Sequence, residues 1–144
     1  FFFFFILIMI QQYHIQLPAF SRGFHIITDH ILNSVNQLPE KGIMHVFIQH
    51  TSAALTINEN ADSTVLLDFE TVFNKLVPEN APYYRHIIEG SDDMPAHIKA
   101  SLLGSSVSIP VKNGCLMLGT WQGIYLCEFR NRAGKRNLVI TVIS

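Results

Sequence analysis

Hydrophobic and polar residues alternate along several stretches of this chain, a pattern typical of half-buried β-strands. The alternating stretches are 11–17, 43–50, 107–111, 121–130 and 138–143. Asn113-Gly114 follows the third stretch and is a strong hairpin signal, with a return strand over 115–118. Closely spaced strands joined by such turns predict a sheet that is largely antiparallel.

Apolar residues follow a helical spacing in other segments, at 28–38 and 60–76, and Pro95 suits the first turn of a short helix that ends at Gly104. Polar residues that can cap helices precede each of them: Thr28 or Asp29, then Asn60, Asp62 or Ser63, then Asp92 and Asp93. Segment 77–92 contains two prolines and reads as a loop, and loops of this length are usually functional or lie at interfaces.

The chain has 144 residues, of which 49% are hydrophobic and 15% charged. This size and composition predict one globular domain with much buried surface. The order of strands and helices predicts the α+β class: a largely antiparallel β-sheet sandwich with helices packed on it.

Residues 1–10 are wholly apolar and form an atypical N-terminal extension before a domain at 11–144. Ten residues are too few to span a bilayer, which needs roughly 20, and the segment lacks the basic start of a secretory signal. It is a truncated signal or anchor, a translation artefact, a first strand or an interface strand. We favour a non-native or atypical extension whose last residues join the first strand, and we expect no membrane partner.

The formal net charge is −1, which argues against a partner with a phosphate backbone, so no nucleic acid is expected. The basic residues cluster only near the end of the chain, at Arg130, Arg132, Lys135 and Arg136. This cluster is either a solvated hairpin tip or an anion site.

Two cysteines, Cys115 and Cys127, lie twelve residues apart and lack the spacing of a zinc or redox motif. A disulfide between neighbouring strands is conceivable. Two buried thiols in a reducing compartment are the favoured reading, and they indicate a cytoplasmic protein.

Polar residues are concentrated in two runs, 50–62 and 86–99, and these runs contain His50, His86 and His97. Neutral imidazole is the commonest metal ligand, and three of them plus water form an open zinc-type site. Spacing alone does not bring the three together. The alternative is a core histidine, a loop side chain and a residue on a helix surface.

Carboxylates supply further candidates. Glu128 shares strand parity with apolar residues, so it is either an acid–base group or an outer contact of a metal ligand, or else an edge-strand glutamate paired with Arg130 or another arginine. Asp92 and Asp93 either both cap the helix at Pro95, or one caps it while the other faces a site. Lys99 contacts a phosphate or is solvated. The residues that could donate hydrogen bonds to a polar ligand are Thr51, Ser52, Asn58 and Asn60.

Four segments together resemble the YjbQ-type family, whose members are also called secondary thiamine-phosphate synthases. The segments are 21–25, 50–60, 89–99 and 119–124, in order and without evident gaps. The resemblance implies a compact α+β fold, a homotrimer and a weak thiamine-phosphate synthase activity. That reaction joins hydroxymethylpyrimidine diphosphate to thiazole phosphate and releases pyrophosphate. The extension 1–10 departs from the family pattern.

The resemblance also implies roles, because the candidate residues fall on polar positions of the family motifs. The implied roles are binding of a divalent metal, zinc or magnesium, by His50, His86 and His97, and catalysis by Asn60, Asp92, Asp93 and Glu128. From side-chain chemistry, the cationic Lys99 and Arg130 are the expected phosphate contacts of a small phosphorylated substrate, and Thr51 and Ser52 could add hydrogen bonds. Three histidines suit zinc, whereas diphosphate chemistry usually employs magnesium on oxygen ligands. The competing functions are a metal-dependent hydrolase of a small phosphorylated or acyl compound, and a non-enzymatic trimer that binds a metal or ligand.

Overall fold

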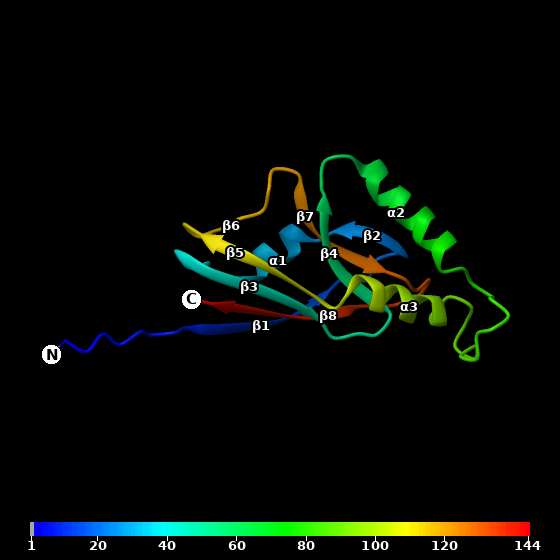
Figure 1. Ribbon diagram of the computed structural model, residues 1–144, viewed down its shortest axis with the longest axis horizontal. Helices are drawn as coiled ribbons and strands as arrows, with labels where there is room; N and C mark the ends of the chain where they lie inside the picture. The colour runs from blue at the N-terminus through cyan, green and yellow to red at the C-terminus, as the bar shows by residue number, and fades with distance from the viewer. Residues whose placement is uncertain (1) are drawn as a thin grey trace.

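The computed structural model describes residues 2–144, which fold into two antiparallel sheets and three helices (Figure 1). The larger sheet has the strand order β1 (Ile10–Leu17), β8 (Arg136–Ile143), β3 (Lys41–Ile48), β5 (Ser106–Lys112) and β6 (Cys115–Leu116). The smaller sheet has the order β2 (Gly23–Ile26), β7 (Gln122–Glu128) and β4 (Ala53–Glu59). The helices are α1 (Thr28–Ser34), α2 (Ser63–Leu76) and α3 (Asp93–Leu103).

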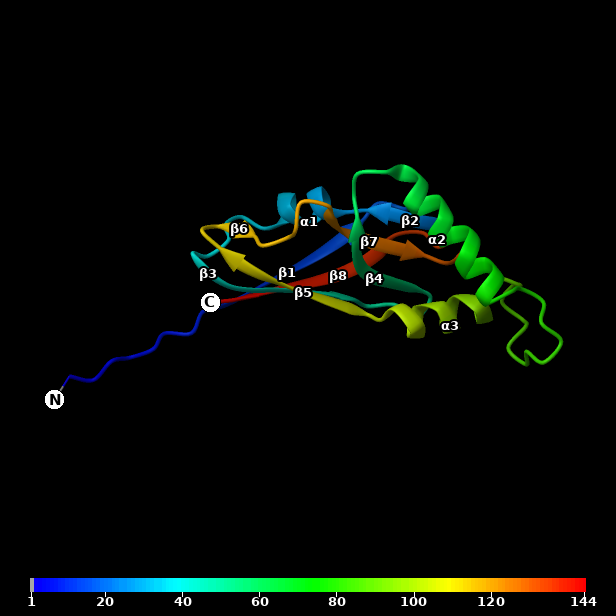
Figure 2. The same ribbon diagram turned by 45° about the horizontal axis from the view of Figure 1, so that its top comes forward.

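The smaller sheet lies between the larger sheet and the helices α2 and α3, as the packing of β7 on both sides shows. Ile124 and Leu126 point into the core shared with the larger sheet, whereas Tyr125 and Cys127 belong to a second core beneath α2 and α3. Both sides of the strand are therefore apolar, which explains its nearly continuous burial. Figure 2 shows α2 and α3 at the same end of the molecule as the loop at 77–92.

The predicted α+β class and the antiparallel sheets are confirmed. Two strands of the smaller sheet were not predicted. β2 has only four residues, and β4 lies inside the polar run 50–62, where Thr56 and Asn58 interrupt the apolar pattern. Both strands pair with β7, so contacts distant in the chain form them.

The helix predictions are confirmed in part. Asp62 caps α2 by accepting a hydrogen bond from the backbone N–H of Thr64 at 2.9 Å. In contrast, α1 ends at Ser34 and not near residue 38, and no side chain of the described chain caps its start. The Thr28 hydroxyl instead accepts a hydrogen bond from the N–H of Ile124 at 2.9 Å, which ties α1 to β7.

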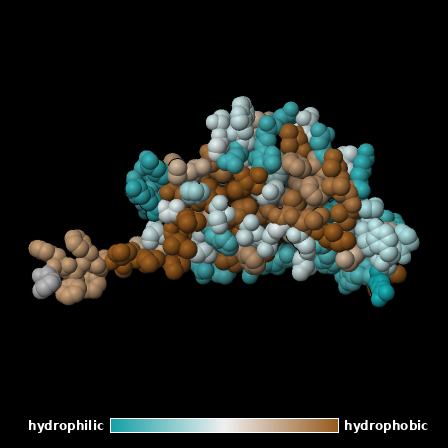
Figure 3. All heavy atoms as spheres, viewed as in Figure 1, coloured by the Kyte–Doolittle hydropathy of each residue, from teal (hydrophilic) through white to brown (hydrophobic). Residues whose placement is uncertain are grey.

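The apolar N-terminal segment extends away from the sheets (Figure 3). Ile10 begins β1, and Met9 exchanges two backbone hydrogen bonds of 3.0 Å with Ser144, so the last residues of the segment continue the first strand as expected. Side chains from Phe2 to Ile8 are exposed. No helix within residues 2–144 is long and apolar enough to cross a membrane.

The cysteines are free thiols and do not form the conceivable disulfide. Cys127 is buried, and burial raises the pKa of its thiol. Cys115 is exposed on the short strand β6, so the expectation that both thiols are buried was wrong for this residue.

Candidate metal centre

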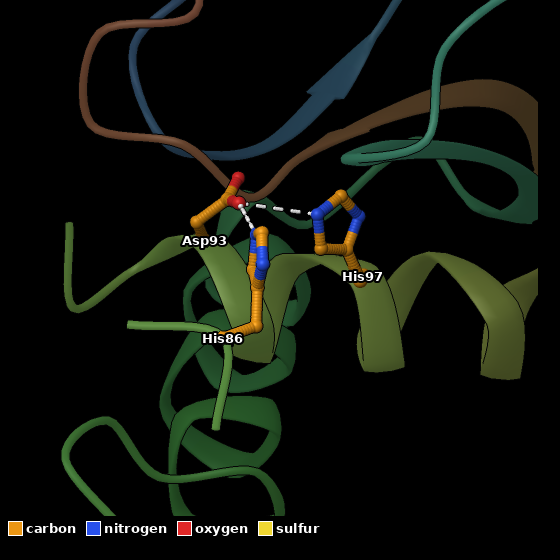
Figure 4. Close-up of side chains that lie close together, drawn as sticks. All are labelled: His86, Asp93 and His97. Atoms are coloured by element: carbon orange, nitrogen blue, oxygen red, sulfur yellow. Dashed lines mark hydrogen bonds and ion pairs between the residues drawn. The ribbon is translucent and has the colours of Figure 1, made fainter. Parts of the chain in front are cut away.

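Asp93, His86 and His97 converge at the start of α3 (Figure 4). One oxygen of Asp93, Oδ2, lies 2.6 Å from Nε2 of His86 and 3.1 Å from Nε2 of His97. The ligand atoms of the three residues all lie within 4.8 Å of one another. Asp93 and His97 are four residues apart on α3 and so share a face, while His86 comes from the loop at 77–92.

The hydrogen bonding of His97 shows which of its nitrogens is free. Nδ1 lies 3.0 Å from the carbonyl oxygen of Thr51, and because a carbonyl only accepts, Nδ1 must carry a proton. In a neutral ring the lone pair of Nε2 then points at the Asp93 carboxylate. Two acceptors at 3.1 Å repel each other unless a cation lies between them. That cation is either a proton on the ring or a metal ion.

The opposite oxygen of Asp93 is held in place by Arg130, whose Nη1 forms an ion pair with Oδ1. Arg130 also donates from Nε to Asp92 Oδ2 at 3.0 Å and from Nη2 to the carbonyl oxygen of Glu89 at 2.9 Å. Burial by itself raises the pKa of Asp93, but hydrogen bonding from His86 and the charge of Arg130 outweigh it and lower the pKa below its usual value. Asp93 is therefore an ionised, oriented carboxylate.

The alternative of Asp92 and Asp93 as simple helix caps was wrong. Asp92 is the N-cap residue of α3 but makes no capping bond with its side chain. Its Oδ2 accepts from Arg130 and from the backbone N–H of Asn131 at 2.9 Å. Although burial opposes it, the pKa of Asp92 is lowered by that backbone hydrogen bond and by the charge of Arg130.

The three ligand atoms suit a small divalent ion. A tetrahedral zinc ion with bonds near 2.0–2.1 Å separates its ligands by about 3.3 Å. The 3.1 Å between His97 and Asp93 is close to this separation, whereas the 2.6 Å between His86 and Asp93 is a hydrogen-bond distance that a bound ion would have to lengthen. The backbone carbonyl on Nδ1 of His97 is the outer contact that orients metal-binding histidines. The side chains of His86 and His97 are 44% and 32% exposed, so one side stays open to solvent for a further ligand.

His50 lies outside this group. Its Nε2 accepts a hydrogen bond from the backbone N–H of Asn137 at 2.8 Å, so that nitrogen has no free lone pair. Burial, together with the charge of Arg136, lowers the pKa of His50 and keeps the ring neutral. Among residues 2–144 the structure therefore joins two of the three predicted histidines to Asp93, and not all three to one another.

Glu128 is fully buried between the sheets, where Arg136 of β8 meets it. Arg136 donates from Nε to Oε1 at 2.7 Å and from Nη2 to Oε2 at 2.6 Å. Arg136 also donates a hydrogen bond to the Ser52 hydroxyl at 3.0 Å, so this hydroxyl, which was expected to contact a ligand, is bonded within the protein. Of the two readings of Glu128, the structure matches the arginine-paired one, although β7 is a central strand and the main partner is Arg136.

The predicted phosphate contacts are directed into the protein. Lys99 is fully buried: its Nζ donates to Asn74 Oδ1 at 2.7 Å and lies 5.6 Å from the centroid of the Phe129 ring. Burial lowers the pKa of Lys99, and the nearby charge of Arg22 adds to this effect. Arg130 forms bonds with Asp92, Asp93 and the Glu89 carbonyl, and Arg136 with Glu128, so neither is free to bind an anion. The other two members of the basic cluster, Arg132 and Lys135, are exposed.

Asn60 and Thr51 lie at opposite ends of β4. At about 3.3 Å per residue, this seven-residue strand separates its two ends by roughly 20 Å. Asn60 Nδ2 donates to the carbonyl oxygen of Gln122 at 3.0 Å, far from the metal centre. Thr51 lies beside His97 and contributes its carbonyl oxygen, a backbone group that side-chain chemistry alone does not reveal.

Two residues that support the centre were not among the candidates chosen from the sequence: Arg22 and Glu79. Arg22 Nη1 donates to Glu79 Oε1 at 2.5 Å, and Ser91 donates to Glu79 Oε2 at 3.0 Å. Because Glu79 and Ser91 lie at the two ends of the loop, these bonds close the loop that carries His86. Arg22 does fall in the 21–25 family segment, which was the only signal available for it.

Besides an open hollow on α3 that is lined by Met94, His97, Ile98, Ser101 and Leu102, two cavities flank the candidate metal centre. One, of about 340 Å³, is lined by His86 and Tyr84 together with other loop residues. The other, of about 400 Å³, lies between the start of β4 and α3 and is lined by His50, Thr51 and His97. The centre therefore has room for a small molecule on both sides.

These features define an α+β protein of two sheets with a histidine–aspartate group at the start of a helix. Residues 13–144 match the family model of UPF0047 protein YjbQ-like, so the chain belongs to this family. UPF0047 protein YjbQ of Escherichia coli O157:H7 is 48% identical over 136 residues, which cover 93% of this chain and 98% of that protein.

Solved structures share the fold. A YjbQ-like protein of unknown function from Sulfolobus solfataricus has a TM-score of 0.81 at 23% identity, covering 96% of this chain and 99% of its own. A conserved hypothetical protein from Thermus thermophilus has a TM-score of 0.77 at 31% identity, covering 88% and 96% of the two chains. The resemblance seen in the sequence motifs is thus confirmed at the level of the family and the fold.

Proposed function

We propose that this protein is a metal-dependent hydrolase of a small compound, with a divalent transition metal held by His86, Asp93 and His97. The observation that carries the proposal is the contact between Nε2 of His97 and Oδ2 of Asp93. Both atoms are acceptors once Nδ1 of His97 donates to the Thr51 carbonyl, so they need a cation between them. Nε2 of His86 lies next to the same Asp93 oxygen and is the third atom that could bind the metal.

The donor set favours zinc over magnesium. Two imidazole nitrogens and one carboxylate oxygen match the ligands of catalytic zinc, whereas magnesium prefers oxygen ligands and bound water. A zinc ion held by His86, Asp93 and His97 would supply an acidified water, which is the nucleophile that hydrolysis requires. Asp93 stays ionised, Arg130 holds it in position, and the Thr51 carbonyl keeps the His97 ring in one tautomer.

The thiamine-phosphate synthase activity implied by the family resemblance is the second candidate. A diphosphate leaving group needs cations around its developing charge. Lys99 and Arg130, the residues expected to supply them, are bonded inside the protein. We therefore rank hydrolysis first. Synthesis of thiamine phosphate from the two named precursors, measured with and without magnesium, tests the second candidate directly.

The first test is the metal content of the purified protein. We expect about one zinc per chain after dialysis against zinc, lost in His97→Ala and in His86→Ala because each removes one of only three ligands. Elemental analysis and zinc titration calorimetry measure this. Affinity should also fall as the pH is lowered, since protons compete with the metal for the imidazoles.

Two further histidine variants serve as comparisons. His14→Ala removes an exposed histidine from the edge strand β1 and should leave the zinc content unchanged. His50→Ala should also keep its zinc, because Nε2 of His50 is already bonded to the backbone of Asn137. Loss of zinc in His50→Ala would instead support the ligand set first predicted from the sequence, which is His50, His86 and His97. Absence of zinc in the unaltered protein would leave a protonated His97 paired with Asp93, and no metalloenzyme.

A further inference from the structure

The two cavities beside the metal centre share an electrostatic property. Among residues 2–144, neither lining includes an aspartate, glutamate, lysine or arginine, although each includes one of the metal-binding histidines. Arg130 approaches the loop near Gly90, but its three nitrogens are bonded to Asp92, Asp93 and the Glu89 carbonyl. A phosphate dianion in either cavity would meet no charge other than the metal's.

The cavity between β4 and α3 is nevertheless rich in hydrogen-bond donors. Because Nε2 of His50 accepts the N–H of Asn137, the proton of the neutral ring lies on Nδ1. This Nδ1 makes no hydrogen bond to any residue from 2 to 144, and His50 lines the cavity. Hydroxyls of Thr51, Ser101 and Ser105 line it as well. Neutral donors without countercharges suit an uncharged ligand that carries acceptors.

We infer that this cavity binds an uncharged acyl compound, an ester or amide, whose carbonyl oxygen accepts a hydrogen bond from Nδ1 of His50. The inference rests on the proposed metal-dependent hydrolysis, because His97 links the cavity to the metal centre. His50 thus binds substrate, a role distinct from the metal-ligand role that the sequence suggested.

The reaction balances as an ordinary hydrolysis. The oxygen of one water bonds to the acyl carbon, and the bond from that carbon to the alcohol oxygen or amine nitrogen breaks. One proton of the water goes to the leaving group and the other to solvent, which leaves a carboxylate. The donor on His50 stabilises the negative charge that develops on the carbonyl oxygen, the effect that preorganised donors have in other acyl transfers.

The test compares two chromogenic probes on the zinc-loaded full chain: p-nitrophenyl acetate, which is uncharged, and p-nitrophenyl phosphate. Each rate is divided by that of the same zinc buffer without protein. We expect the enhancement for the acetate to exceed that for the phosphate by at least about tenfold. A larger enhancement for the phosphate would overturn the substrate class while leaving the metal site in place.

Matched variants test the cavity itself. Ser101→Trp should fill it and lower kcat/KM for p-nitrophenyl acetate by about tenfold or more, whereas Ser108→Trp, exposed on β5 and outside this lining, should stay within about twofold. Ser101→Arg should raise relative activity on the phosphate. His50→Gln should lower kcat on the acetate with the zinc content unchanged.

Zinc analysis of every variant separates the two ideas. Normal zinc with acetate hydrolysis insensitive to Ser101→Trp and His50→Gln means that the cavity assignment is wrong and the metal centre stands. No zinc in the unaltered chain means that the proposed function itself fails.

Discussion

At the scale of single residues, the chemistry of the site depends on which charged side chains form bonds inside the protein. Asp93 gives one oxygen to Arg130 and the other to two histidines. Lys99 is buried against Asn74, so it supports the packing of α2 against α3 and does not face a ligand. Burying a charge without a partner is costly, which explains why each buried charge here has close polar contacts.

The buried ion pair between Arg136 and Glu128 yields a prediction of stability. Arg136→Met leaves the Glu128 carboxylate, which is 0% exposed, without its cation and should lower the free energy of unfolding by roughly 3–5 kcal/mol. Urea denaturation followed by circular dichroism measures the change.

Two comparisons sharpen that experiment. Lys135→Met alters the exposed neighbour and should change stability by no more than about 0.5 kcal/mol. The double variant Glu128→Leu with Arg136→Met should recover part of the loss, because no unpaired charge remains. A single Arg136→Met variant as stable as the unaltered protein would contradict the role given to the pair.

At the scale of elements, the loop at 77–92 is the part of the site that depends most on its supports. It supplies His86, whereas Asp93 and His97 stand on the rigid α3. Glu79 joins the loop to Arg22 of the segment before β2 and to Ser91 at the loop's far end. Hydrogen bonding from Arg22 is the main effect that keeps Glu79 ionised, since it lowers the pKa of this carboxyl against the opposing effect of burial.

Glu79→Gln should therefore weaken metal binding without removing a ligand. We expect zinc affinity to fall by about tenfold, the size of effect seen when outer contacts of metal ligands are lost. Competition with a fluorescent chelator measures the affinity, and faster proteolysis within 77–92 would report the loosened loop. Glu89→Gln is the matched control, since only the backbone carbonyl of that exposed loop residue is used. Equal affinities for both variants would show that the Glu79 contacts do not position His86.

At the scale of the whole molecule, exposed apolar surface points to assembly. Val65, Phe69, Val72 and Phe73 of α2 line an open, largely apolar groove, and Val72 is 50% exposed. Exposed apolar residues clustered on one helix are typical of surfaces that another subunit covers. The homotrimer implied by the family resemblance is consistent with such a surface and stays a prediction.

Light scattering of a chain shortened by its first eight residues tests the assembly. We expect a mass close to three times that of one chain, because the ladder between β1 and β8 begins at Ile10 and is left intact. The full chain of 16.3 kDa should form larger aggregates in addition, since residues 2–8 are exposed and apolar. A monomer mass for the well-folded shortened chain would rule the trimer out.

The sequence by itself determined the local structure and the family. Alternation of apolar and polar residues predicted the strands of the larger sheet, and Asp62 was recognised among the possible caps of α2. The motif segments identified the family correctly. These features depend on neighbours in the chain, whose spacing is visible in the sequence.

Only the tertiary structure decided which polar groups meet. Asp93 has the sequence signature of a helix cap but binds two histidines, His50 bonds to β8 and not to the metal group, and Lys99 turns into the core. The bonds of His50 and Lys99 join residues 87 and 25 positions apart, and the contact of His86 with Asp93 depends on the path of a loop. Such contacts follow from how the two sheets and α3 pack together, which residue spacing does not contain.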